Sequence, residues 1–123
     1  MVLVDTSVWI NHLRTGNPYL VRLLEGNVVA IHDFVIGELA CGNLKNRQEC
    51  LSLLGLLPRC RQASHEEVLF FIEHKRLMGR GLGYIDVCLL ASATISGCRL
   101  WTEDRKLAGM AKELECVLIP KGS

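Results

Sequence analysis

The sequence lacks the features of a membrane protein, a secreted protein or a polycationic nucleic-acid-binding protein. No apolar run approaches the ~18 residues that a membrane-spanning helix needs, so we expect no membrane contact. No basic segment precedes the first apolar residues and Asp5 interrupts them, so we expect no signal peptide and a cytoplasmic location. The formal net charge is +1 and no polybasic run occurs, so any contact with nucleic acid must be local.

Disulfide and zinc patterns are also absent. The six cysteines contain no C-x-x-C pair, and the four histidines match no zinc-ligand spacing. Free cysteine commonly packs as a small hydrophobic residue, and a cytosolic chain keeps its thiols reduced. We therefore predict that every cysteine is a packing residue, namely Cys41, Cys50, Cys60, Cys88, Cys98 and Cys116.

What the chain does have is a high apolar content in short runs. Half of its 123 residues are apolar, enough for one core, and we expect a single domain over residues 1–123. Short buried strands are predicted at residues 1–4, 28–31, 98–102 and 116–119, with a weaker strand signal at 57–62. Trp9 and Trp101 are predicted to pack in the core or at an interface.

Helix signals separate these strands. Asn17-Pro18 predicts a helix start, Asp33 is placed to cap the next helix, and Ser64 with Glu67 forms a capping box for a helix that ends near Met78. Further helices are predicted at about 46–54, from residues 84–86 to Gly97, and from Asp104 to Leu114. Strands that alternate with helices predict parallel βα units with right-handed crossovers.

Four acids are placed to meet at one edge of this sheet. Asp5 and Asp104 follow predicted strands, and Glu38 and Asp86 lie near predicted helix starts. Strand carboxyl ends and the N-termini of the following helices face the same edge, where ligands bind in open α/β folds. Each Asp taken alone could instead be a simple helix cap. Glu38 lies among apolar residues, so we expect it to be largely buried and to have a partner.

Clustered carboxylates repel one another and call for a compensating charge. At ~4 Å and an effective dielectric near ~20, each close pair costs about 4 kcal/mol. Mg²⁺ and Mn²⁺ prefer oxygen ligands, lower the pKa of bound water and neutralise a departing oxygen. A carboxylate set without His or Cys ligands therefore favours phosphodiester chemistry over zinc hydrolysis.

With these motifs the chain resembles a PIN-domain ribonuclease, and most closely a VapC-type toxin of a toxin–antitoxin pair. The matching stretches lie at residues 4–7, 37–39, 82–91 and 100–104. The resemblance implies a three-layer α/β/α sandwich with a central parallel sheet, and a Mg²⁺- or Mn²⁺-dependent endoribonuclease site. It assigns the acidic quartet to Asp5, Glu38, Asp86 and Asp104, as catalytic and metal-binding residues, with Ser7 and Thr102 as supporting hydroxyls. It also implies an RNA substrate, a small VapB-like antitoxin whose tail blocks the site, and a homodimer.

The sequence does not assign a single role to several other residues. Glu103 is an additional acid beside Asp104. Lys75, Arg76 and Arg80 fit a solvated helix face or phosphate contacts. The glycine-rich segment 79–83 has no P-loop context, and we interpret it as a flexible connection that could move over a site. The alternative function is a receiver-like Mg²⁺-binding signalling module. It would need paired acids after the first strand, where only Asp5 is present.

Overall fold

A short parallel sheet forms the centre of the protein. The computed structural model describes residues 1–121, with strands β1 (Val2–Val4), β2 (Val29–Ala30) and β3 (Arg99–Trp101) in the order β2-β1-β3. Val2 pairs with Val29 on one side and with Arg99 on the other. β1 is buried along its whole length, as its apolar sequence predicts.

The two remaining predicted strands are reduced to single bridges. Residues 57–62 contribute only the pairing of Arg59 with Ile31, and residues 116–119 only the pairing of Val117 with Leu100. The prediction of a regular last strand was therefore wrong. Pro120 follows at once and has no N–H with which to continue a ladder.

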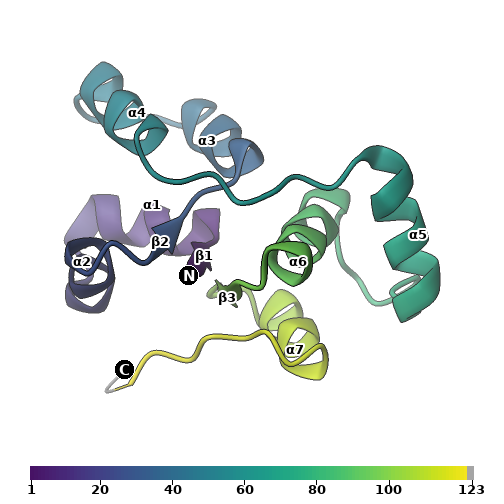
Figure 1. The fold of residues 1–123 in the computed structure, drawn as a ribbon. Helices are drawn as coiled ribbons and strands as arrows, with labels where there is room; N and C mark the ends of the chain where they lie inside the picture. The colour runs from purple at the N-terminus through teal and green to yellow at the C-terminus, as the bar shows by residue number, and fades with distance from the viewer. Residues whose placement is uncertain (122–123) are drawn as a thin grey trace.

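Helices lie on both sides of the sheet, as the predicted α/β/α sandwich requires. In Figure 1, α1 runs behind β2, α2 lies to the left of the strands, α6 and α7 lie to their right, and α3 and α4 lie in the upper part. The helices are α1 (Thr6–Thr15), α2 (Pro18–Glu25), α3 (Asp33–Ala40), α4 (Arg47–Gly55), α5 (His65–Lys75), α6 (Tyr84–Ser96) and α7 (Arg105–Glu113). No helix within residues 1–121 is long and apolar enough to span a membrane.

Local capping explains where several helices begin. The Asn17 side chain accepts from the Leu20 N–H, and Ser64 and Glu67 exchange the two hydrogen bonds of a capping box, so both predicted starts are confirmed. α5 ends at Lys75, earlier than predicted, because Arg76 adopts a left-handed conformation with φ 54°.

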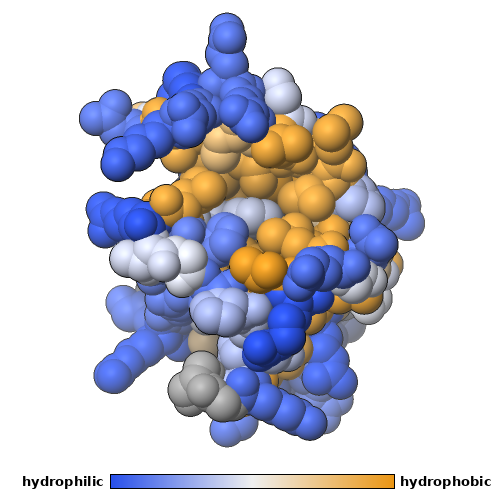
Figure 2. All heavy atoms as spheres, turned by 90° about the vertical axis from the view of Figure 1, so that its left-hand side faces the viewer, coloured by the Kyte–Doolittle hydropathy of each residue, from blue (hydrophilic) through white to orange (hydrophobic). Residues whose placement is uncertain are grey.

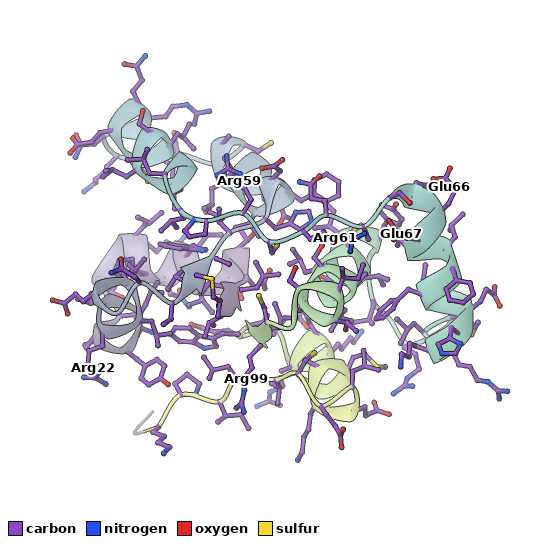
Figure 3. All side chains as sticks on the ribbon, in the orientation of Figure 1. Arg22, Arg59, Arg61, Glu66, Glu67 and Arg99 are labelled. Atoms are coloured by element: carbon purple, nitrogen blue, oxygen red, sulfur yellow. The ribbon has the colours of Figure 1, made fainter. Side chains whose placement is uncertain are left out.

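α3 is capped by a residue that the sequence did not suggest. His32 has extended backbone angles, and its Nδ1 accepts from the Phe34 N–H at 2.9 Å. Asp33 lies inside the first turn and accepts instead from Arg59 Nε at 2.6 Å, so its predicted capping role was wrong. Arg59 lies on the extended segment that leads from α4 to α5 (Figure 3).

The core gathers around β1 and α6. Seven consecutive α6 residues, from Val87 to Ala93, are buried, and both tryptophans are buried as predicted. Cys60, Cys88, Cys98 and Cys116 are buried, whereas Cys50 is half-buried and Cys41 is exposed. The prediction that every cysteine packs in the interior was wrong for Cys41, which lies at the exposed end of α3.

Candidate active site

Asp5 lies at the carboxyl end of β1 and is only 7% exposed. Its Oδ2 accepts two hydrogen bonds, from the Thr102 hydroxyl at 2.7 Å and the Ser7 hydroxyl at 2.9 Å. It is the N-cap residue of α1, yet its side chain makes no capping bond. The carboxylate is therefore held by one hydroxyl from the first turn of α1 and one from the end of β3, and it is free of a helix-capping role.

The two hydroxyls also fix the chain that follows β3. The Glu103 N–H donates to Ser7 Oγ at 3.0 Å, and the Asp104 N–H donates to Thr102 Oγ1 at 3.0 Å. Ser7 and Thr102 thus join the ends of β1 and β3 and set the position of Asp104. Ser7 and Thr102 therefore lie beside Asp5 and Asp104, where the sequence predicts them.

Asp104 and Asp86 both hold nearby backbone. Asp104 caps α7, because its Oδ1 accepts from the Leu107 N–H at 3.0 Å. Asp86 Oδ2 accepts from the Gly83 N–H at 3.1 Å in the first turn of α6. Burial raises the pKa of the Asp86 carboxyl; the Gly83 N–H opposes the shift, and the negative charges of Asp5 and Asp104 add to it. Asp5 and Asp104 therefore lie within electrostatic reach of Asp86.

Glu38 approaches from α3 and differs from the other acids. It is exposed, which corrects the expectation of burial, because its side of α3 faces solvent beside α1. Its expected partner is present: the Thr6 hydroxyl donates to Glu38 Oε1 at 2.6 Å. Thr6 follows Asp5 directly, so this hydrogen bond links Glu38 to the end of β1. Sequence reasoning did not single out Thr6, although a hydroxyl next to Asp5 was a usable signal.

Glu103 is directed away from this group. Its Oε2 accepts from Asn11 Nδ2 at 2.5 Å, one turn beyond Ser7 on α1. Arg80 is also engaged elsewhere, in an ion pair with Glu113. Lys75 and Arg76 lie at the exposed end of α5.

One pattern is shared by the four acids. Each uses one carboxylate oxygen for a hydrogen bond within the protein, and among residues 1–121 its second oxygen accepts none. The free oxygens are Asp5 Oδ1, Glu38 Oε2, Asp86 Oδ1 and Asp104 Oδ2. Over the same residues, no group of three or more Asp, Glu, His or Cys side chains is close enough to hold a metal ion without rearrangement.

Oxygen-only donors with one free oxygen each suit a hard divalent cation. Mg²⁺ retains several waters and binds through few direct carboxylate ligands, so water can bridge carboxylates that are too far apart for direct ligation. The donor set therefore fits Mg²⁺ or Mn²⁺ in chemical type.

The fold and site define an α/β protein with an acidic site at the carboxyl edge of a parallel sheet. The chain belongs to the PIN-domain family: the family model described as PIN domain matches residues 2–113. This confirms the resemblance seen in the sequence and leaves the receiver-like alternative without support.

Individual relatives agree with this assignment. The chain is 46% identical over 114 residues to Ribonuclease VapC32 of Mycobacterium tuberculosis, in strains CDC 1551 and H37Rv, and the match covers 92% of this chain and 92% of each relative. The crystal structure of PAE2754 from Pyrobaculum aerophilum aligns with a TM-score of 0.59 at 21% identity. That alignment covers 88% of this chain and 77% of that one, and it supports the fold.

Proposed function

We propose that residues 1–123 act as one cytoplasmic, Mg²⁺- or Mn²⁺-dependent endoribonuclease domain, the toxin of a toxin–antitoxin pair. The observation that carries the proposal is the shared pattern of the four acids, in which each has one oxygen held by the protein and one left free. The identity to proteins named Ribonuclease VapC32 supports RNA as the substrate.

The four carboxylates divide the work between binding and positioning. Asp5, Glu38, Asp86 and Asp104 would hold the cation through their free oxygens, directly or through water. When bound, such a cation supplies charge neutralisation and an activated water for phosphodiester hydrolysis. Thr102 and Ser7 hold Asp5 and Asp104 in their relative positions and do not contact the substrate. Because the protein already fixes one oxygen of Asp5, Asp86 and Asp104, these three acids need little further ordering, whereas the exposed Glu38 is free to adjust on binding.

A groove beside Glu38 supports the proposal of an antitoxin partner. It has a volume of about 440 Å³ and is lined by α1, by α3 and by the segment that follows α3. Its lining residues include Ile10 and Leu13, which are 41% and 42% exposed. Figure 2 shows that hydrophobic side chains gather on the side of the molecule where α1, α2 and α4 lie in Figure 1. An apolar protein segment bound here would reach Glu38 and block the acidic site.

We also propose a homodimer, as the resemblance implies. Phe70 and Leu69 on α5 are 69% and 47% exposed, which is apolar surface that an interface would remove from water. Light scattering of the purified protein should give twice the chain mass of 13.7 kDa. A monomer at all concentrations would contradict this part of the proposal.

The deciding experiment is sequencing of cleaved RNA ends. The purified protein is incubated with total RNA and Mg²⁺, with a chelator in a parallel sample. Discrete new ends should appear with Mg²⁺ and disappear with the chelator. Mg²⁺ should also raise the melting temperature, because it binds only the folded state, and Glu38→Gln should reduce that rise. Equal cleavage in chelator would contradict the proposed metal dependence.

The partner is tested in cells. Expression of the chain alone should inhibit growth, and co-expression of its proposed VapB-like antitoxin should relieve the inhibition. Ile10→Asp, which puts a charge in the groove, should preserve toxicity and prevent relief. Relief that survives this change would show that the antitoxin does not use the groove.

A further inference from the structure

The glycine-rich segment 79–83, which the sequence suggests is a flexible connection, contacts side chains of α7 at two points. The Arg80 guanidinium forms an ion pair with Glu113 at 2.5 Å. The Lys106 side chain lies over Gly81, where an added Cβ would be 3.0 Å from the Lys106 Nζ and 3.2 Å from its Cδ. Lys106 and Glu113 are seven residues apart, about two helical turns, so one face of α7 contacts the segment.

Glycine suits position 81 for two reasons. Its φ is +78°, in the region that side-chain-bearing residues rarely adopt. Any Cβ would also press on the Lys106 ammonium group, which would have to move. Gly81 therefore leaves room for the positive charge of Lys106 to lie over this segment.

Chain connectivity limits how far that charge can lie from the acidic site. Lys106 is two residues after Asp104, and Gly81 is two residues before Gly83, whose N–H donates to Asp86. With ~3.8 Å between consecutive Cα atoms, the ammonium lies within roughly 15 Å of the Asp86 carboxylate. The ion pairs found within residues 1–121 are Arg59–Asp33 and Arg80–Glu113, so Lys106 has no ion-pair partner there.

We propose that Lys106 binds a backbone phosphate of the RNA, close to the phosphate that is cleaved. This inference rests on the proposed function and names a residue that positions its substrate. An ammonium group is a compact charge with three donors that suits phosphate oxygens. Stacked nucleic-acid strands carry a phosphate about every 3.4 Å of rise, so a phosphate within a few nucleotides of the cleaved bond reaches Lys106. Such a contact sets the path of the strand and reads no base sequence.

The test compares two lysines of the same helix. Lys106→Met removes the proposed contact, and Lys112→Met removes an equal charge from the exposed far end of α7. Binding of a short fluorescein-labelled single-stranded RNA of mixed sequence is measured over a range of salt concentrations, in an Asp5→Asn background that keeps the RNA intact. Lys106→Met should make the slope of log K against log salt shallower by ~0.7, the value for one phosphate contact.

Cleavage kinetics give a second readout. Lys106→Met should raise KM for the cleaved RNA while kcat is retained, and Lys106→Arg should restore KM because the charge is kept. Lys112→Met should match the wild type in both measurements. Equal effects of the two Met variants, or no rescue by Arg, would overturn the inference.

The two proposals fail in different ways. RNA binding that depends on Lys106, without any cleavage in Mg²⁺, would overturn the nuclease function and support the phosphate contact. RNA cleavage that Lys106→Met leaves unchanged would support the nuclease function and overturn the phosphate contact. A wild-type protein that binds no RNA would overturn both.

Discussion

The acidic site has two unlike halves. The strand-end half, made of Asp5, Ser7, Thr102 and Asp104, is tied together by hydroxyls, and its central carboxylate is 7% exposed. The α3 half, made of Thr6 and Glu38, is a single exposed hydrogen bond at the start of the chain's first helix. Buried hydrogen bonds are costly to leave unmade, whereas exposed groups exchange theirs with water. The strand-end half therefore keeps its side chains in fixed positions, whereas the α3 half can adjust to a bound ligand.

The largest expected effect comes from removal of charge in the strand-end half. Asp5→Asn keeps the shape of the side chain and can still accept from Thr102, but it loses the negative charge. RNA cleavage should fall by ~10²-fold or more, the scale seen when a charge-stabilising group is lost. Asp86→Asn should behave alike, since Asn could still accept from Gly83. Normal cleavage by Asp86→Asn, measured beside circular dichroism of the fold, would show that Asp86 serves only the helix.

The two hydroxyls sharpen the comparison between the halves. Thr102→Val deprives Asp5 of a donor and leaves the Asp104 N–H without its acceptor, so unfolding free energy should fall by about 1–3 kcal/mol and cleavage by ~10–100-fold. Thr6→Val removes one exposed bond to Glu38 and should cost about 0.5 kcal/mol. Urea unfolding measures both. Equal losses would contradict the distinction between a rigid and an adjustable half.

The stability of the α3 half of the site should depend on pH, because a histidine caps the start of α3. His32 is buried and caps α3 through Nδ1, which must be unprotonated to accept from Phe34. Burial lowers the pKa of His32, and the charge of Asp33 partly opposes the shift. The folded state favours the neutral His32 ring. The helix cap therefore contributes its full stability at a pH above 6.5, the usual pKa of histidine, and this stability is lost as the pH falls through the lowered pKa of the folded state.

The size of this effect should be that of a helix cap, about 1 kcal/mol. His32→Asn keeps a capping side chain that does not titrate in this range. Thermal unfolding between pH 7 and pH 5 should therefore show a smaller loss of stability for this variant than for the wild type. Parallel pH profiles for the two proteins would rule out His32 as the source.

The smallest effect concerns the thiol at the other end of α3. Cys41 is exposed and should react with a maleimide under native conditions, without loss of fold. Cys60 should stay unmodified, because it is buried and its burial raises the pKa of its thiol to about 11. Mass spectrometry of the labelled protein distinguishes the sites. Rapid labelling of Cys60 would contradict the packing around it.

What the sequence could predict was local in character. An apolar run followed by an acid is a short-range pattern, so the strand ends at Asp5 and Asp104 and the hydroxyls beside them could be placed. The exposure of Glu38 depends on how α3 is covered by other elements, which its neighbours in sequence do not determine. The capping role of His32 likewise follows from the bridge of Ile31 to a distant segment, which sets the backbone angles before α3.

The single bridges beside β2 and β3 protect the protein from unwanted self-association. A three-stranded sheet would otherwise present rows of unpaired N–H and C=O groups, which invite another chain to add a strand. Here Ile31 exchanges bonds with Pro58 and Cys60, and the backbone of Leu100 is satisfied from the C-terminal segment. Each outer segment is irregular and carries a proline, Pro58 or Pro120, with no N–H to offer. Within residues 1–121 neither edge offers a regular strand for fibril-like growth, even though the sheet is small.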